Sequence, residues 1–500
     1  MSSTVQLQAQ VQKTSITDLP PELLSVIFKF AHESTTPVRL EKDIIPAWMR
    51  MEGPQGFQQS VTALVNPTIP EEPNLKSPAL FPYSLAAVCS FWRDVLCSHS
   101  EFWTIIVLFV DSKPTSLVEA SLYLKWSREQ QIDVFITRRD GLRAAFHPDL
   151  HEKCQIDALL HILRPHLRRC RSLHVDAHLS SSFPIIQKTF DGIDAFSLEV
   201  MELVCDTHDL ADSDDEDSDW DDDVDEFEPD LSRLVIDGKN FRLTSANLHN
   251  WVDKCMDLEQ ITIAHYQTPE DEDYCLENLL DSLEALTSLD QLKLESLHFA
   301  RRPHIFPETF LTTPYVHLED VSEIFIEDIS KYVLFDPFSV LRITRCPLPD
   351  LRNFVPDTLI LEDISSNVNL LSAITAWEGE NLWLDRCHSF SKSVLKALAR
   401  HRHRSSARYP CNEMHRLLLY RLPNFSIVSL KRMIDRRNDY VDYKLPDWKS
   451  TTDFGPAISH LAVVQCGFGK LSVKDEKWFR TRLVEFHWSS FSFSLYTYLR

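Results

Sequence analysis

Glycine is scarce in this chain, with 9 residues among 500, against a usual share of about 7%. Phosphate-binding loops need glycine where the backbone approaches a phosphate, and neither GxGxxG nor GxxxxGK[ST] occurs in the sequence. The local signatures GxSxG and HExxH of hydrolases and metalloproteases do not occur either. We therefore expect a protein that is not an enzyme and that uses no cofactor.

Positive charge is also in short supply, because 51 Lys and Arg residues face 74 Asp and Glu residues, for a formal net charge of −23. This balance repels nucleic acid and anionic lipid over most of a surface. The longest strongly apolar run, residues 102–110, is too short to span a bilayer. Residues 1–15 lack the apolar stretch of a secretion signal. We expect a cytoplasmic or nuclear protein that binds neither nucleic acid nor membranes.

Paired cysteine motifs are missing, although the chain has 11 cysteines. Their odd number and scattered positions, without a CxxC pair, favour buried thiols in a reducing compartment over a disulfide framework. His401, His403, Cys411 and His415 could be drawn together as a zinc site, but their spacing fits no standard finger. We therefore expect no metal.

Two helical patterns are present near the N-terminus. The first covers residues 16–33, where Asp18 can cap the helix, Pro21 suits its first turn and apolar residues recur at helical spacing. The second covers residues 83–97, with Ser84 as its cap. Residues 35–80 between them are polar and rich in proline, which is typical of an inserted loop. The sequence predicts two amphipathic helices separated by a long excursion.

The residue types of these helices are more specific than their periodicity. The strings LPPELLSVIF and LAAVCSFWRD, followed by Trp103, resemble the F-box family, and most closely the F-box-like proteins common in mushroom-forming fungi. The family motif is a Leu-Pro at the start of one helix, a Val-Cys-x-x-Trp-Arg in the next and a closing Trp. The resemblance covers residues 16–110 and leaves residues 1–15 as a disordered N-terminus.

The resemblance implies docking on the Skp-type adaptor of an SCF ubiquitin ligase, with this chain as a non-catalytic substrate receptor and as a monomer within the hetero-complex. A helical module this rich in apolar side chains has more apolar surface than it can bury internally. From the motif we expect the adaptor-binding residues Leu19, Pro20, Leu23, Leu24, Ile27, Phe28, Val88 and Trp92. Packing within the chain is the alternative for each residue. The alternative for the protein is an interaction scaffold whose interrupted F-box does not engage the ligase.

A short L-x-x-L-x-L phrase recurs at uneven spacing after residue 165, and several of its copies continue into a cysteine. The form is that of a leucine-rich repeat, in which each unit contributes one strand and returns through a helix or loop. Helical returns are expected at residues 245–256, 274–286 and 391–401. The twelve phrases are RSLHV (171–175), AFSLEV (195–200), LSRLVI (231–236), LEQITI (258–263), LDQLKL (289–294), VSEIFI (321–326), FSVLRI (338–343), TLIL (358–361), NLWL (381–384), MHRLLL (414–419), ISHLAV (458–463) and LVEFHW (483–488).

These patterns predict an α/β protein, in which a small all-α F-box-like module precedes an irregular leucine-rich-repeat solenoid of parallel strands with helical returns over residues 111–500. The alternative is another α/β domain in which the same strands form an ordinary parallel sheet.

Alternation along each strand predicts which side chains face solvent, namely those before, between and after the core leucines. The position after the last apolar residue is acidic in six of nine phrases. Like charges on neighbouring strands disfavour a sheet, so these acidic positions are either a solvated face of an acidic protein or a surface for a target that presents Lys or Arg. The predicted target-binding residues are Phe325, Glu327, Ile360, Glu362, Trp383 and Asp385. The protein target itself is unknown.

Residues 206–230 carry fifteen acidic side chains and no Lys or Arg. Such a block repels itself, and we expect a disordered loop extruded from the repeats. Ser213 and Ser218 each have an acidic residue at +1 and +3, the preference of acidophilic kinases, which makes them candidates for phosphorylation. A solubilising loop and a regulatory or basic-partner-binding tract both remain open.

Overall fold

The computed structural model of the 500-residue chain describes most of the sequence outside its two ends and several connecting segments. The described residues are 19–35, 75–77, 80–139, 151–184, 189–190, 192–207, 228–237, 248, 252, 255–268, 274–299, 310–335, 339–365, 368, 370–375, 377–400, 409–422, 425–444, 457–467 and 470–489.

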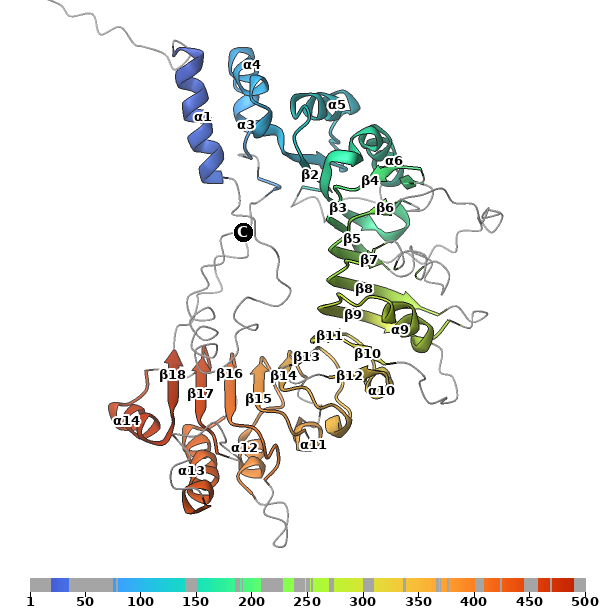
Figure 1. Ribbon diagram of the computed structural model, residues 1–500. Helices are drawn as coiled ribbons and strands as arrows, with labels where there is room; N and C mark the ends of the chain where they lie inside the picture. The colour runs from blue at the N-terminus through green and yellow to red at the C-terminus, as the bar shows by residue number, and fades with distance from the viewer. Residues whose placement is uncertain are drawn as a thin grey trace, which may run out of the picture.

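One parallel sheet of fourteen strands forms the largest part of the fold (Figure 1). Each strand pairs with the strand that precedes it and the strand that follows it in this sheet, so the spatial order is the chain order. The strands are β1 (Ile105–Phe109), β2 (Ile132–Thr137), β3 (Cys170–Leu179), β5 (Val200–Thr207), β7 (Arg233–Asp237), β8 (Gln260–Gln267), β9 (Gln291–His298), β11 (Tyr315–Glu319), β13 (Val340–Thr344), β14 (Thr358–Glu362), β15 (Asn381–Asp385), β16 (Arg416–Tyr420), β17 (His460–Val464) and β18 (Glu485–Ser489).

Eleven α-helices accompany the sheet within the described residues, and the predicted α/β class is confirmed. Three of them precede β1, and the others lie between successive strands. They are α1 (Pro21–Thr35), α3 (Tyr83–Ala86), α4 (Ser90–Ser98), α5 (Leu117–Trp126), α6 (Glu152–Leu163), α9 (Leu276–Glu284), α10 (Glu323–Ile329), α11 (Leu370–Ile374), α12 (Lys392–Leu398), α13 (Ile427–Lys444) and α14 (Val473–Arg482). Short 3₁₀ turns include Ser100–Trp103, which leads into β1.

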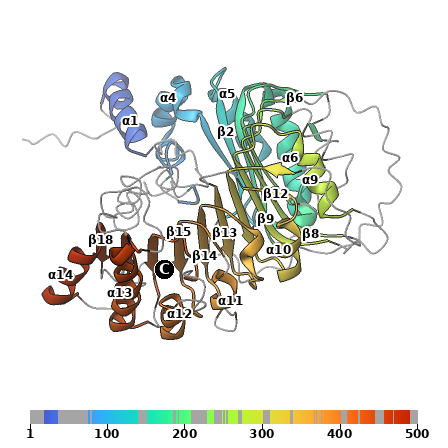
Figure 2. The ribbon, with the colours of Figure 1, turned by 60° about the horizontal axis from the view of Figure 1, so that its bottom comes forward.

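The helices between strands lie along the outer side of the curved sheet, and the inner face carries none of the described helices (Figures 1 and 2). Alternate strand residues explain the asymmetry, because Leu359 and Leu361 of β14 point into the core beneath the helices, as do Leu382 and Leu384 of β15. One continuous apolar core extends in this way from β1 to β18.

Ten of the twelve predicted phrases coincide with strands of this sheet. The phrase VSEIFI was predicted to be a strand and forms α10 instead, because the Ser322 side chain accepts a hydrogen bond from the Phe325 backbone N–H at 3.1 Å and caps a helix. Phe325, Ile326 and Ile329 then face the core at helical spacing. The strand of this repeat is β11, which precedes the phrase.

Two other predictions differ from the structure in detail. The phrase AFSLEV precedes its strand, since β5 begins only at Val200. Of the predicted helical returns, residues 274–286 contain α9 and residues 391–401 contain α12, whereas most of residues 245–256 lie outside the described part of the chain.

A left-handed backbone residue follows every strand of the fourteen-stranded sheet from β11 to β17, with φ between 50° and 56°. This conformation costs a side-chain-bearing residue about 1–2 kcal/mol. The sheet offsets the cost by extending its hydrogen bonds past the strand ends: the Arg345 N–H donates to the Glu362 carbonyl at 3.0 Å, and the Asp363 N–H to the Asp385 carbonyl at 2.9 Å. The left-handed residues are Asp320, Arg345, Asp363, Arg386, Arg421 and Gln465.

The residue that follows each left-handed residue is alternately aliphatic and a cysteine, in the order Val321, Cys346, Ile364, Cys387, Leu422, Cys466. Each thiol bonds to the preceding strand: Cys387 Sγ donates to the Leu361 carbonyl at 3.2 Å, and Cys466 Sγ donates to the Leu419 carbonyl at 3.3 Å. Burial raises the pKa of Cys387 to about 12, so the thiol stays protonated and acts as a hydrogen-bond donor.

Replacing Cys387 by alanine should lower the free energy of unfolding by about 1–3 kcal/mol, because it removes a buried sulfur and the hydrogen bond that the thiol donates to the Leu361 carbonyl. Urea denaturation measures the change. The matched control is Cys154→Ala, at an exposed cysteine on α6, which should change stability by no more than about 0.5 kcal/mol. Equal effects of the two substitutions would contradict a structural role for the buried thiols.

Candidate functional site

The cysteine and tryptophan of the Val-Cys-x-x-Trp-Arg string build the N-terminal helical module from within. The second helix was predicted as one segment over residues 83–97, but the chain forms α3 and α4 with Cys89 in extended conformation between them. Cys89 Sγ accepts a hydrogen bond from the Trp92 backbone N–H at 3.5 Å and so caps α4. The Trp92 ring meets Phe28 of α1 edge-on, with ring centroids 5.3 Å apart.

The remaining motif residues close the open ends of these short helices. Arg93 Nε donates to the Ala86 carbonyl at the end of α3 at 3.1 Å. Trp103 Nε1 donates to the Leu96 carbonyl in the last turn of α4, also at 3.1 Å. The first bond satisfies a carbonyl at a helix end, and the second adds to the hydrogen bond that the Leu96 carbonyl accepts from the His99 N–H. Cys89, Trp92, Arg93 and Trp103 are therefore accounted for by the internal packing of the module.

Helix α1 has two apolar faces. Leu24 and Phe28 are 0% and 1% exposed in the module core. On the other face Leu23, Val26, Ile27 and Phe30 are 44–68% exposed, at the i, i+3, i+4, i+7 spacing of a single helical stripe. We call these four residues the α1 stripe. An exposed stripe of large apolar side chains is typical of a helix that docks on a partner.

The structure divides the predicted adaptor-binding residues into two groups. Pro20, Leu23, Ile27 and Val88 are exposed, and Leu19 is half-buried against the module core. The other three, Leu24, Phe28 and Trp92, are buried in that core, where they hold the helices together. Sequence reasoning missed Val26 and Phe30, although their helical spacing from Leu23 was a usable signal.

Tyr83 connects the helical module to the sheet. Its hydroxyl donates to the Ile105 carbonyl at 3.1 Å and accepts from the Val107 N–H at 2.9 Å. It thus pairs with backbone groups at the free edge of β1, as a neighbouring strand would. The Tyr83 ring also meets the Tyr123 ring of α5 edge-on at 5.0 Å between centroids. Strand β1 itself lies within the range predicted for the F-box-like module. The module and the sheet therefore form one packed unit.

The predicted insertion of residues 35–80 lies mostly outside the described residues, but its end contacts the sheet. Lys76 Nζ lies 3.2 Å from Asp176 Oδ2 on β3, and the Thr137 hydroxyl donates to the same oxygen at 2.8 Å. Residues 75–77, near the end of the predicted insertion, therefore lie beside β3.

Two of the three acidic side chains predicted to bind a target, Glu362 and Asp385, are paired with arginines of the chain itself, whereas Glu327 lies on α10. Glu362, which is 8% exposed, accepts hydrogen bonds from Arg342 and from Arg386, whose Nη2 lies 2.5 Å away. Asp385, 7% exposed, accepts a paired hydrogen bond from Arg421, with 2.9 Å from Nε to Oδ1. The cations lie up to 36 residues from their acids in the sequence, and the register brings them together.

These arginines act against a substantial cost of burial. Burial raises the pKa of the Glu362 carboxyl, but Arg342 and Arg386 outweigh it and hold the pKa below its usual value. Burial raises the pKa of Asp385, and the negative charge of Glu362 raises it further. Arg421 lowers it by less, so the pKa of Asp385 rises to about 6. Burying carboxylates of this kind is tolerated only because cations pair with them.

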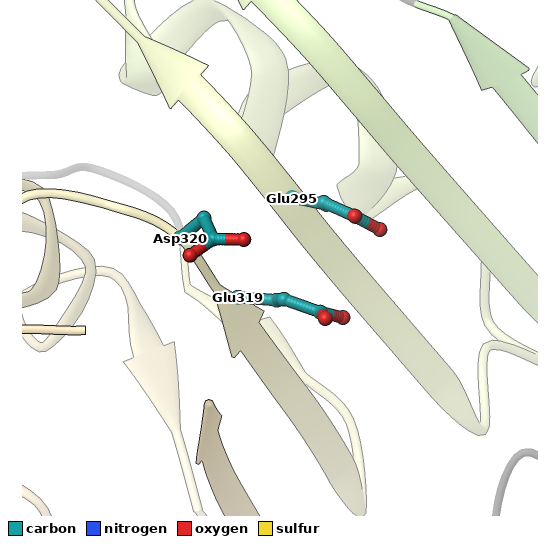
Figure 3. Close-up of side chains that lie close together, drawn as sticks. All are labelled: Glu295, Glu319 and Asp320. Carbon is teal, nitrogen blue, oxygen red and sulfur yellow. The ribbon is translucent and has the colours of Figure 1, made fainter. Parts of the chain in front are cut away.

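Three carboxylates from β9 and the end of β11 lie within 4.8 Å of one another (Figure 3). They belong to Glu295, Glu319 and Asp320. Lys293 Nζ lies 2.7 Å from Glu295 and 2.6 Å from Glu319, and Arg345 Nη2 lies 2.7 Å from Glu319 and 2.5 Å from Asp320. An ammonium and a guanidinium already pair with all three carboxylates of this cluster, and we assign no metal to it.

None of the six predicted target-binding residues has the strand-surface position expected for it. Phe325 and Glu327 lie on α10, where Phe325 is buried in the main core. Ile360 and Trp383 are on the inner face but only 3% and 9% exposed, because they pack in a second apolar cluster. Its other members are Tyr315, Val340, Leu418, Ala462 and Val464. Glu362 and Asp385 are the buried, paired carboxylates described above.

Several other predicted features fall outside the described residues. Ser213 and Ser218 do so, as do residues 208–227 of the acidic run. Of the four residues weighed as a zinc site, His401 and His403 are not described, while the Cys411 thiol donates to the Ile374 carbonyl at 3.0 Å. In the described part of the chain no helix is long and apolar enough to cross a membrane.

Comparison with protein-family models and with curated proteins finds no match to this chain.

Substituting Glu362 by glutamine should lower the free energy of unfolding by about 3 kcal/mol, since it leaves two arginines beside an uncharged, buried partner. Chemical denaturation at neutral pH measures the loss. The control is Glu476→Gln in the exposed pair between Glu476 and Arg480 on α14, which should cost no more than about 0.5 kcal/mol. A Glu362→Gln loss as small as that of the control would contradict a stabilising role for the buried pairs.

Proposed function

We propose that this protein is the substrate-recognition subunit of an SCF-type ubiquitin ligase. In this proposal the N-terminal helices dock on the Skp-type adaptor, and the long sheet binds a protein target. The chain catalyses nothing itself, and it acts by holding a target close to the ligase, which raises the effective concentration of the target there.

The α1 stripe is the observation that carries the proposal. A buried face anchors α1 to the module through Leu24 and Phe28, while Leu23, Val26, Ile27 and Phe30 remain at the surface. Val88, 57% exposed between α3 and α4, adds a further apolar side chain to the surface of the module. The F-box-like motif, whose residues build this same module, connects the surface with an adaptor.

The architecture of the sheet supports a leucine-rich-repeat receptor. Parallel strands in chain order, with helices on one side only, are typical of a solenoid in which each repeat contacts only its neighbours. An ordinary doubly wound sheet instead carries helices on both faces and changes direction at a switch point. The tie from Tyr83 to β1 would hold a bound target at a defined position relative to the adaptor.

The acidic positions at the strand ends do not favour a basic target. A basic target was one expectation, because acidic residues follow one another on neighbouring strands. The guanidinium groups of Arg342, Arg386 and Arg421 offset these charges within the chain. The proposed receptor function therefore rests on the shape and continuity of the sheet, and the chemical class of its target is left open.

The double substitution Leu23→Ala with Ile27→Ala should weaken adaptor binding about 30-fold or more, because truncating one central anchor costs about 2 kcal/mol. Binding of purified adaptor to the full chain is measured by calorimetry. Both side chains are exposed, so the module should keep its fold, which circular dichroism verifies. Val473→Ala, at an exposed valine on α14, should bind as the wild type does.

The same measurements separate the proposal from the scaffold alternative. Wild-type chain that fails to bind the adaptor at micromolar concentrations would favour a scaffold whose interrupted module does not engage the ligase. Adaptor binding that is unchanged by the double substitution would move the interface away from the α1 stripe. Deleting α1 is a poor test, because Leu24 and Phe28 belong to the module core.

A further inference from the structure

The charge of the chain is divided unevenly along its length. Residues 391–500 contain 20 Lys and Arg but only 9 Asp and Glu, for a net charge of +11. Residues 1–390 contain the other 31 Lys and Arg and the other 65 Asp and Glu, for a net charge of −34. These counts include the residues outside the described ranges. The last part of the chain is therefore basic within an acidic protein, and such an asymmetry favours an oppositely charged partner.

Seven exposed cations of this part lie on or directly after three neighbouring helices. These helices are α12, α13 and α14, which follow one another along the outer side of the last repeats (Figures 1 and 2), with α13 packed against both of the others. On α12 and on α13 two exposed cations lie four residues apart, and on α14 two lie three residues apart, so each pair is on one face of its helix. We call the seven residues the basic patch: Lys392, Lys396, Arg400, Arg432, Arg436, Lys474 and Lys477.

Each carboxylate that the structure describes on these helices already has a cation other than those of the basic patch. Arg482 of α14 lies 3.4 Å from Asp435 and 3.3 Å from Asp439 of α13. Helix α12 carries no carboxylate. None of the seven cations of the basic patch forms an ion pair with any residue that the structure describes, so their charge is not neutralised there. The remaining pairs on these helices are Lys431 with Asp475 and Arg480 with Glu476.

We infer that the basic patch is a docking surface for an acidic segment of a partner protein. Packed helices lie about 8–10 Å apart, and an extended chain advances about 3.3 Å per residue. A segment that crosses the three helices with Asp or Glu at every third position therefore places one carboxylate beside the cations of each helix. Val428 is 66% exposed one turn before Arg432 on α13 and offers an apolar contact beside these cations. Complementary charge then gives the segment its specificity and its rate of association.

A nucleic acid fits the basic patch less well than a short acidic segment does. Its phosphates continue past the patch, where the charge of −34 on residues 1–390 repels them. A short segment ends at the patch, and at physiological salt it interacts only with charges within about 8 Å.

This inference goes beyond the proposed receptor function and does not depend on it. The basic patch lies on helices of the last repeats, whereas the α1 stripe precedes the first strand and a target would bind the inner face of the sheet.

Fluorescence anisotropy of the full chain with a labelled peptide of about ten residues, at about 100 mM salt, tests the inference. A peptide with glutamate at every third position, separated by serine and leucine, should bind, and the same peptide with glutamine in place of glutamate should bind at least about tenfold more weakly. Arg432→Glu with Arg436→Glu should weaken the glutamate peptide at least about tenfold, because two attractive charges become repulsive. Lys392→Glu with Lys396→Glu, on α12, should weaken it to a similar extent.

The matched control is Lys125→Glu with Lys153→Glu, at exposed lysines of α5 and α6. It changes the net charge of the chain by the same amount but lies outside the basic patch, so binding should stay within about twofold of the wild type. All of the substituted side chains are exposed, and circular dichroism verifies that each variant keeps its fold.

Carbodiimide coupling of the peptide carboxylates to lysines of the chain locates the bound peptide. Amide bonds to Lys392, Lys396, Lys474 or Lys477 support the inference. Coupling confined to other lysines, or two patch variants that bind the peptide as tightly as the control does, would overturn it. An oligonucleotide of the same length that displaces the labelled peptide at a lower concentration than the unlabelled peptide does would make a nucleic acid the occupant. A wild-type dimer that Arg432→Glu with Arg436→Glu converts to a monomer would make a second copy the occupant, and either result would equally contradict the inference.

Discussion

In-register stacking of parallel strands is the constraint on which the rest of this structure depends. Each strand pairs with its neighbours in the chain, so the same position of successive repeats recurs about 4.8 Å away. Every position thus becomes a column across the sheet. A column of apolar residues continues the core. In the column where cysteines alternate with aliphatic residues, each thiol bonds to the strand before it. A column of acidic residues destabilises the sheet unless cations pair with it.

The charged column shows how the chain meets this demand. Arg345, Arg386 and Arg421 follow their strands in left-handed conformation, where the chain turns away from the sheet. Their guanidinium groups reach carboxylates on their own or the preceding strand, such as Glu319 and Glu362. The same turn residues therefore continue the backbone hydrogen bonds and neutralise the acidic column. The acidic column, which by itself indicated a basic partner, is thus paired with arginines within the fold.

The N-terminal module follows a different rule, because its helices are too short to bury all of their apolar side chains. One face of α1 closes the small core with Trp92, and the α1 stripe is left over. An element with two apolar faces therefore marks a candidate surface for a partner.

The sequence by itself determined ten of the fourteen strands of the sheet, the start of α1 at Pro21 and the alternation that directs leucines such as Leu359 and Leu361 into the core. These properties follow from spacing along the chain, which is local. Only the tertiary structure decided that Leu24 and Phe28 are core while Leu23 and Ile27 are surface, because all four fit one amphipathic helix.

The tertiary structure also decided which charges pair and whether residues 321–326 form a strand or a helix. Asp385 and Arg421 are 36 residues apart, and only the strand register brings them into contact. The phrase at residues 321–326 satisfies both strand and helix spacing, and the Ser322 cap decides for the helix. Local spacing specifies elements, whereas burial and ion pairing depend on neighbours that the sequence does not name.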